Sequence, residues 1–252
     1  MKENFVINPH FAHLEVKLKR LLQNFEKDGE VLDDSGRNII KTKRFEALNL
    51  NIKKFKTPSF LQSLVYRFLR KSKARRSFEY ALRLRAVGIL TPEPIAYKEC
   101  FSVGLKDSFY VSEQIDYDFD FRVINHQPNF PDREKILRQF TEFTYKLHEN
   151  NIHFLDHSPG NTLIKKKADG NYEFYLIDLN RMRFEKMKFN MRMKNFRRLW
   201  LSKTMLRIIA EENARLYGKP VEEVQKVMRY YSRRFQKIKN AKALRRRRKN
   251  SK

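Results

Sequence analysis

The sequence predicts an α+β fold in two lobes, a small β-rich lobe at the N-terminus and a helical lobe after it. The 252 residues include 21 Phe and are 41% hydrophobic, which is enough apolar side chain to bury a real core. Short apolar runs between turn residues dominate up to about residue 115, whereas helical spacing dominates after it, interrupted by one hairpin. We therefore place the lobes at residues 1–115 and 116–236, followed by a basic tail at 237–252.

The first lobe is expected to begin with a helix and to continue with strands. Apolar residues recur at helical spacing from Leu14 to Phe25, opposite a basic face. The runs on either side of DDSGRN predict a β-hairpin, and ALNLNIKKF predicts a third strand. Helical spacing returns over residues 60–86, and the prolines of GILTPEPIAY then predict a loop. A strand pair is expected after that loop, at 95–101 and 109–115.

The second lobe is expected to be helical around one hairpin. Residues 132–149 have helical spacing, with acidic residues near the start that suit a helix N-terminus. NTLIKKK and NYEFYLIDL, separated by the Asp169-Gly170 turn, predict the clearest hairpin in the chain. From about residue 190 the spacing is helical throughout, with Gly218 ending one helix and Pro220 starting the next.

The chain is strongly basic. Its 55 Lys and Arg against 29 Asp and Glu give a formal net charge of +26, which implies a polyanionic partner: nucleic acid, anionic lipid or a phosphorylated substrate. Residues 237–252 alone hold nine Lys and Arg and no acid, so we expect a tail that is frayed, or helical only when docked on an anion. The single Cys100 argues against a disulfide scaffold, and no apolar run approaches the ~18 residues of a membrane span. These features predict a cytoplasmic protein.

Three polar residues around the predicted hairpin form the strongest chemical signal. Asp156 lies in HFLDHSPGN, directly after the long helix, and Asn161 follows five residues later. Asp178 ends the apolar strand YLI of the hairpin, which returns the chain towards the Asp156 loop. Two carboxylates and a carboxamide oxygen that converge there would make a hard, all-oxygen set suited to Mg²⁺ and phosphates.

This arrangement resembles the protein-kinase-like superfamily, in which a catalytic Asp precedes an Asn by five residues and a metal-binding Asp follows on the next hairpin. The resemblance implies a two-lobed protein-kinase-like fold that binds ATP and Mg²⁺. It also implies that Asp156 orients and deprotonates the acceptor hydroxyl and that Asn161 and Asp178 hold Mg²⁺.

The upstream parts of the kinase pattern occur in the expected order. LNIK resembles the V-A-I-K strand, so that Lys53 would hold the nucleotide phosphates, and Glu79 in the next predicted helix would pair with it. The strand FYVSEQI resembles the hinge strand, where backbone groups near Glu113 and Ile115 would bond adenine. Taken by itself, Glu79 could instead pair on the surface with Arg75, Arg76 or Arg83.

Details of the loop resemble one branch of this superfamily, the lipopolysaccharide core kinases. Asp156-His157-Ser158-Pro159-Gly160-Asn161 is similar to the D-x-x-P-x-N loop of kinases that act on sugars and small molecules, and LHENNIHFLDHSPGN, IDLNRMRF and the basic C-terminal helices extend the resemblance over about residues 25–200. It implies phosphorylation of a Kdo or heptose hydroxyl in a lipopolysaccharide core or another phosphorylated glycolipid. It also implies a peripheral position on the anionic inner face of the cytoplasmic membrane.

Other functions stay open at this point. The chain has Asp178-Leu179-Asn180 in place of D-F-G and lacks a G-x-G-x-x-G loop, so a pseudokinase is one alternative. A kinase-like protein acting on another small molecule or a protein is a second. The basic charge would also suit a nucleic-acid-binding protein, although we find no zinc finger, RNP-type strand or KH-type loop.

Overall fold

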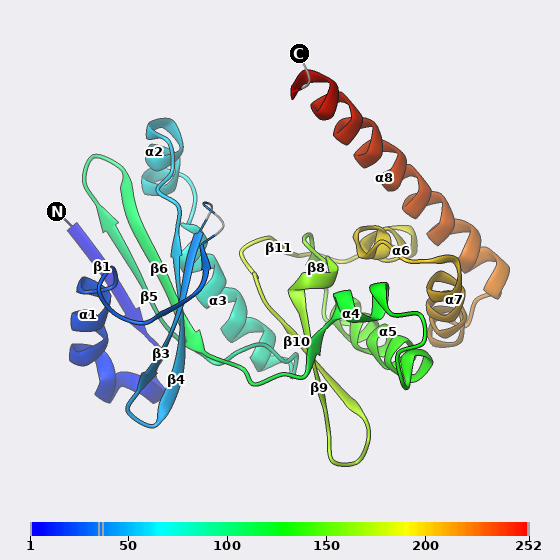
Figure 1. Cartoon of the computed structure of the whole chain (residues 1–252), viewed down its shortest axis with the longest axis horizontal. Coiled ribbons are helices and arrows are strands. Elements are labelled where there is room, and N and C mark those ends of the chain that lie inside the picture. The colour runs from blue at the N-terminus through cyan, green and yellow to red at the C-terminus, as the bar shows by residue number, and fades with distance from the viewer. Residues whose placement is uncertain (1, 35, 37, 251–252) are drawn as a thin grey trace. The chain divides into compact units, whose positions relative to one another are not determined.

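The computed structural model describes residues 2–34, 36 and 38–250, and the chain divides into two compact units, Met1–Asp116 (unit 1) and Tyr117–Lys252 (unit 2). Unit 1 contains a large sheet and unit 2 is mainly helical, which confirms the α+β prediction (Figure 1). Ser35 and Arg37 of the expected DDSGRN turn lie outside the described residues, as do the last two residues of the basic tail.

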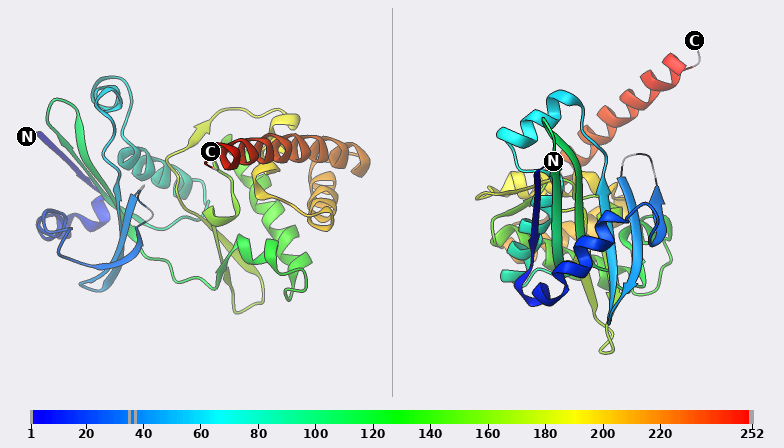
Figure 2. Two further views of the ribbon diagram at one scale, coloured as in Figure 1. Left: turned by 45° about the horizontal axis from the view of Figure 1, so that its top comes forward. Right: turned by 90° about the vertical axis from the view of Figure 1, so that its left-hand side faces the viewer.

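Unit 1 is built on a six-stranded antiparallel sheet in the order β1-β5-β6-β4-β3-β2, which the right-hand view of Figure 2 faces. Strand β4 lies inside the sheet, where Lys53 pairs with Ile40 of β3 on one side and Tyr110 of β6 on the other. The strands are β1 (Lys2–Ile7), β2 (Glu30–Asp34), β3 (Asn38–Phe45), β4 (Leu48–Phe55), β5 (Pro94–Phe101) and β6 (Leu105–Glu113).

Helices cover the two faces of this sheet, and the alternation of side chains along β4 decides which helix each residue meets. Leu50 and Ile52 belong to the core formed with α1, whereas Phe55 packs with Phe78 of α3. Figure 1 shows α1 and α3 on opposite sides of the strands. The helices of unit 1 are η1 (Pro9–Leu14), α1 (Glu15–Gln23), α2 (Phe60–Phe68) and α3 (Lys73–Ala86).

Unit 2 combines five α-helices with short strands that carry the loops of interest. Its core is formed mainly by α5, α7 and the start of α8, around the fully buried Phe121, Phe140 and Phe196. The elements are β7 (Phe119–Asp120), α4 (Phe121–His126), α5 (Arg133–Glu149), β8 (Ile152–Phe154), η2 (Pro159–Asn161), β9 (Thr162–Lys166), β10 (Tyr172–Leu176), β11 (Met182–Phe184), α6 (Phe189–Asn195), η3 (Phe196–Leu199), α7 (Lys203–Tyr217) and α8 (Val221–Asn250).

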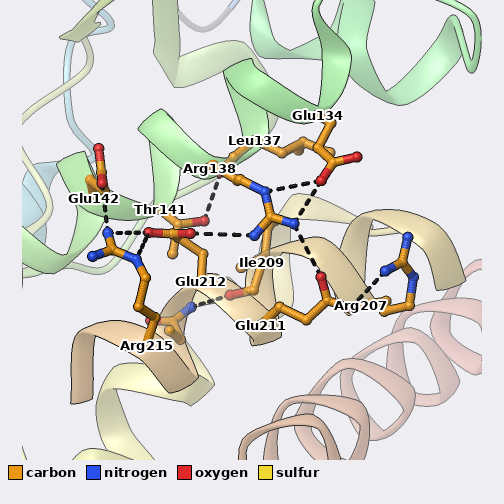
Figure 3. A network of polar contacts seen from close by, with 11 residues as sticks. Glu134, Leu137, Arg138, Thr141, Glu142, Arg207, Ile209, Glu211, Glu212 and Arg215 are labelled. Carbon is orange, nitrogen blue, oxygen red and sulfur yellow. Dashed lines mark hydrogen bonds and ion pairs between the residues drawn. The ribbon is translucent and has the colours of Figure 1, made fainter. Parts of the chain in front are cut away.

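A buried carboxylate joins α5 to α7. The Glu212 side chain is 5% exposed and accepts hydrogen bonds from Arg138 Nη1 at 3.3 Å and Arg215 Nε at 2.8 Å (Figure 3). Arg138 also donates to Glu134 and Glu211, and Arg215 donates to Glu142. Because every charge in this set faces opposite charges, the network offsets the cost of burying Glu212 and fixes α5, the helix that precedes the loop containing Asp156.

Several elements differ from the sequence-based expectation. Strand β1 was not expected, because its residues alternate weakly, and it is an edge strand held by β5. The helical stretch 60–86 is two helices, since Ser72 caps a new helix by accepting a bond from the Arg75 N–H. Strand β6 starts at Leu105, four residues before the expected 109, and Pro159 starts a short 3-10 turn between Asp156 and Asn161. The basic tail continues α8 without a break as far as Asn250.

Candidate active site

The loop that contains Asp156 is hydrogen-bonded at both ends to the chain segment that follows strand β10. The Leu155 N–H donates to the carbonyl of Arg181 at 3.0 Å, and the Ile177 N–H donates to the carbonyl of Asn161 at 3.1 Å. Strands β8 and β11 pair on one side of the loop, and β9 and β10 pair on the other. The chain from 177 to 181 therefore runs alongside the chain from 155 to 161.

Asp156, Asn161 and Asp178 are brought together in unit 2 by this arrangement. The Asn161 Nδ2 donates to the Asp156 carbonyl at 2.8 Å, which fixes the loop and leaves the amide oxygen as the end of the side chain that can meet a cation. Asp178 has a left-handed backbone, with φ of 57°, and its Oδ1 accepts a bond from Asn180 Nδ2 at 2.7 Å. A left-handed conformation is uncommon for a residue other than glycine, and such conformations concentrate at functional sites.

Two arginines hold the Asp156 carboxylate. Arg198 Nη2, from η3, donates to Oδ1, and Arg181 Nη1 lies 3.5 Å from Oδ2. The Asp156 side chain is only 16% exposed, so these contacts fix its orientation. No motif in the sequence points to either arginine as a partner of Asp156. The basic character of residues 181–198 was the available signal, but it does not tell which cation reaches Asp156.

The loop is supported from inside unit 2 by a buried pair. Asn195 Nδ2 donates to the Phe154 carbonyl at 2.8 Å, and its Oδ1 lies 3.1 Å from His148 Nε2. Burial lowers the pKa of His148 to about 3, so the ring is neutral, and its proton is assigned to Nε2 because Asn195 presents an oxygen there. His148 and Asn195 thus set the position of the residue two before Asp156.

Gly160 allows a close contact at the same loop. An added Cβ at this position would overlap the guanidinium of Arg122, which also pairs with Asp120 at 3.2 Å. A third arginine side chain therefore lies against the segment between Asp156 and Asn161. Like Arg181 and Arg198, it comes from an element distant in sequence, which is why no local pattern pointed to it.

Lys53 and Lys54 lie on opposite faces of the unit 1 sheet. Lys54 bonds to Glu26 at 2.6 Å, and its ammonium lies 5.9 Å from the centre of the Phe25 ring, on the α1 face. Lys53 lies on the other face with Phe55, whose ring centre is 5.4 Å from the Lys53 ammonium. Since α3 covers that face, Lys53 and the helix that carries Glu79 are on the same side of the sheet.

Glu79 accepts hydrogen bonds from Lys71 Nζ at 2.6 Å and Arg75 Nε at 2.8 Å. Burial alone would raise the pKa of the Glu79 carboxyl, but these two bonds outweigh it and lower the pKa below its ordinary value. The surface pairing with Arg75 that the sequence also allowed is therefore present. The pairing of Glu79 with Lys53 stays a prediction.

The two predicted hinge residues lie at and just beyond the end of β6. The Glu113 N–H donates to the Glu93 carbonyl at 2.9 Å, and the Ile115 carbonyl accepts a bond from Gln114 Nε2 at 3.2 Å. Burial, together with the nearby Glu93 carboxylate, raises the pKa of Glu113. The Gln114 N–H donates to the Asn49 carbonyl at 2.8 Å, so the start of the chain segment that leaves the sheet is anchored to β4.

The oxygen atoms of Asn161 and Asp178 fit Mg²⁺. Both are hard ligands, and Mg²⁺ is commonly held by one or two protein oxygens while water and substrate phosphates complete its shell. The Ile177–Asn161 backbone bond places the two residues side by side without help from a metal. The residues present thus suit a magnesium ion bound together with a nucleotide.

Comparisons with known proteins agree with this geometry. The model of the lipopolysaccharide kinase (Kdo/WaaP) family matches residues 23–238. A solved structure of WaaP in complex with acyl carrier protein superimposes with a TM-score of 0.65, at 16% sequence identity, over 93% of this chain and 98% of that chain. At this identity the superposition shows the fold, and it confirms the kinase-like architecture. No curated protein sequence matches the chain.

Proposed function

The chain belongs to the lipopolysaccharide kinase (Kdo/WaaP) family and is a kinase, and on that premise we propose that it transfers a phosphoryl group from ATP, with Mg²⁺, to a hydroxyl of a lipopolysaccharide core sugar. The observation that carries this proposal is the convergence of Asp156, Asn161 and Asp178. Two backbone hydrogen bonds, Leu155 to Arg181 and Ile177 to Asn161, produce that convergence within one unit.

Asp156 is the residue that meets the acceptor in this proposal. As the acceptor oxygen bonds to the γ-phosphorus, the bond from that phosphorus to the bridging oxygen of the nucleotide breaks, and the hydroxyl proton passes to the Asp156 carboxylate. Arg198 and Arg181 keep the carboxylate in one orientation. Their charges also lie near the group being transferred, where positive charge stabilises the transition state.

The remaining residues position the nucleotide. Asn161 and Asp178 would hold Mg²⁺, which neutralises charge on the phosphates when it is bound. Lys53 would hold the α- and β-phosphates, Glu79 would orient Lys53, and backbone groups at Glu113 and Ile115 would bond adenine.

The acceptor and the location follow from the family and the charge. A net charge of +26 suits a phosphorylated glycolipid and the anionic lipids around it. In the described part of the chain, no helix is both long and apolar enough to cross a bilayer. We therefore propose a peripheral enzyme at the inner face of the cytoplasmic membrane, with lipopolysaccharide core as its acceptor.

Thermal unfolding with nucleotide tests the proposed site. ATP with Mg²⁺ should raise the melting temperature of the wild type, because a ligand that binds only the folded state stabilises it. Asp178→Asn should lose most of that shift, since asparagine tolerates the left-handed backbone but removes the charge. Asp169→Asn, at the exposed hairpin turn, is the matched control and should keep the full shift. The proposal fails if neither ATP nor GTP stabilises the wild type.

A further inference from the structure

Helix α2 carries its large apolar side chains on the side that faces solvent. Phe60, Leu61, Phe68 and Leu69 are 66%, 75%, 71% and 82% exposed, whereas the one buried side chain of the helix is the polar Ser63. An ordinary surface helix has the opposite arrangement, with its apolar stripe towards the core. Together with Val65, which is 40% exposed, and the half-buried Leu64, these side chains form two parallel rows at spacings of four residues. We call these rows the α2 apolar face: Phe60, Leu64 and Phe68, and Leu61, Val65 and Leu69.

The polar side of α2 is fixed to the turn between β5 and β6. Arg67 Nη1 donates to the carbonyls of Ser102 and Val103, the second at 2.8 Å. Gly104 packs so closely that an added Cβ would overlap Ser63 Oγ and lie 2.9 Å from the Ser63 carbonyl carbon. The helix therefore cannot turn its apolar face inward without breaking these contacts. Val103, at the tip of the turn, is itself 65% exposed and extends the apolar surface.

The charge around this face indicates what covers it. From residue 56 to residue 78 the chain has seven Lys and Arg and no Asp or Glu. A groove beside α2 is lined by four of these cations, Arg67, Arg70, Lys71 and Arg75, and by Lys2, together with two acids, Glu3 and Glu99. Exposed aromatic and aliphatic side chains bordered by cations are the pattern of a helix that lies in the interface of an anionic bilayer.

We propose that α2 and the β5–β6 turn insert into the surface of an anionic lipid bilayer. The α2 apolar face would enter the boundary of the acyl chains, while Lys56 and Arg70, both exposed, would meet lipid phosphates. The inference rests on the proposed function in one respect, which is that a lipopolysaccharide acceptor is presented by a bilayer. It differs from general electrostatic attraction because it requires apolar contact at one helix.

A fluorophore on α2 tests the insertion directly. The native Cys100 is buried, so Leu61→Cys can be labelled selectively with a nitrobenzoxadiazole dye in the full chain. With vesicles of phosphatidylethanolamine and phosphatidylglycerol, emission should rise about threefold or more and shift to shorter wavelength, as the dye leaves water. The same dye at Val16→Cys on α1, a position 73% exposed, should not respond.

A sedimentation measurement with unlabelled protein gives a second readout. Leu61→Gln/Phe68→Gln should weaken binding to these vesicles by about tenfold or more, because each buried apolar side chain adds to the partition free energy. Val16→Gln/Val87→Gln removes two exposed apolar side chains elsewhere in unit 1 and should bind as the wild type does.

The outcomes separate the insertion from its alternatives. A silent dye at position 61 on protein that sediments with vesicles overturns the proposal. A dye that responds to purified acyl carrier protein but not to vesicles also overturns the proposal and makes α2 a protein-binding surface. Self-association of the chain that covers α2 would overturn it as well. These assays contain neither acceptor nor nucleotide. Phosphorylation of detergent-dispersed lipopolysaccharide, measured in parallel, therefore tests the proposed function independently of the insertion of α2.

Discussion

At the scale of single residues, the carboxylate of Asp156, the proposed base, is held in one orientation by contacts within unit 2. It is bonded by Arg198, whose guanidinium lies 6.0 Å from the centre of the Phe235 ring of α8, and it is paired with Arg181. Phe235 in turn packs edge-on against Trp200 at 5.6 Å. The orientation of the carboxylate is therefore set by residues from η3, from α8 and from the chain after β10. Phosphoryl transfer depends on such positioning more than on covalent help.

Replacing Asp156 by asparagine should separate chemistry from binding. The change keeps the shape of the side chain but removes the acceptor for the hydroxyl proton, so turnover should fall by about 10²–10⁴-fold. Nucleotide binding, measured by the same thermal shift with ATP and Mg²⁺, should stay near that of the wild type. Near-normal turnover in Asp156→Asn would remove Asp156 from its role.

His157, next to Asp156, makes stability depend on pH. The ring is fully enclosed by Phe140, Phe154 and Phe196, and within the described residues neither of its nitrogens has a hydrogen-bond partner. Burial lowers its pKa to about 3 from an ordinary value near 6.5. Between these values the unfolded chain binds the proton that the folded chain excludes. The stability that the neutral His157 ring contributes is therefore fully present above about pH 6.5 and is lost progressively as the pH falls towards 3.

His157→Phe should reduce this dependence. One histidine of this kind contributes a slope of about 1.4 kcal/mol per pH unit between its two pKa values, and phenylalanine does not titrate. Burial also lowers the pKa of His148 to about 3, so the variant would retain the pH dependence that His148 contributes. Urea unfolding at pH 7 and pH 5 measures the difference. An unchanged loss of stability between these pH values in the variant would show that His157 does not titrate as described.

The residues that local sequence could predict are those in short motifs. The convergence of Asp156, Asn161 and Asp178 could be predicted because one loop and one hairpin hold them, and the hydrogen bond from Ile177 to Asn161 shows that the hairpin returns to the loop. Their chemical roles stay a prediction. Arg122, Arg181 and Arg198 were missed because they reach the loop from three different elements. Among many lysines and arginines, sequence cannot distinguish a cation that turns inward from one that stays in solvent.

At the scale of elements, α8 is a single helix from Val221 to Asn250 that combines two roles. Its first part contributes the buried Val224 and Met228 to the core of unit 2. Beyond residue 236 its described side chains are exposed, and the segment has no acidic residue. The expectation of a separate basic tail missed this continuity, because acid-free sequence rich in Lys and Arg has no apolar stripe that predicts a helix.

Deleting residues 237–252 should weaken attachment and leave chemistry intact. The cut keeps Phe235, which lies near Arg198, but removes nine cations, each worth about 1 kcal/mol on an anionic surface when well placed. Sedimentation with anionic vesicles should weaken, and the apparent Michaelis constant for lipid-embedded acceptor should rise while the turnover number barely moves. Added salt should weaken vesicle binding of the full chain more steeply than that of the truncated chain. Unchanged vesicle binding and activity would contradict this role of the segment.

Element boundaries illustrate where sequence patterns stop being informative. The break between α2 and α3 falls in a basic run without Gly or Pro, and the clearest local mark of it is the bond that the Ser72 hydroxyl accepts from the Arg75 N–H. The inverted orientation of α2 depends on Ser63, Gly104 and Arg67, which are brought together only when β5 and β6 pair. The hairpin around Asp169 and Gly170 was predicted because its turn and both strands are contiguous in sequence.

At the scale of the whole molecule, the kinase-like fold was predicted from the order of the elements along the chain. A β-rich unit with an inner strand bearing Lys53, a helix bearing Glu79 and a helical unit with the Asp156 loop follow one another in the chain, and the family match over residues 23–238 confirms the kinase assignment. Sequence could not give the edge strand β1 or the short pair β8 and β11. Tertiary pairing rather than local pattern stabilises these strands.

The most direct test of the central claim is mass spectrometry of lipopolysaccharide from cells that have the gene, lack it, or carry Asp156→Asn in its place. We predict that core oligosaccharide from cells with the wild-type gene carries one more phosphate than that from cells without it. Asp156→Asn should give the unphosphorylated form, although the protein is present and binds nucleotide. Identical phosphate content in all three samples would contradict the assignment of lipopolysaccharide core as the acceptor.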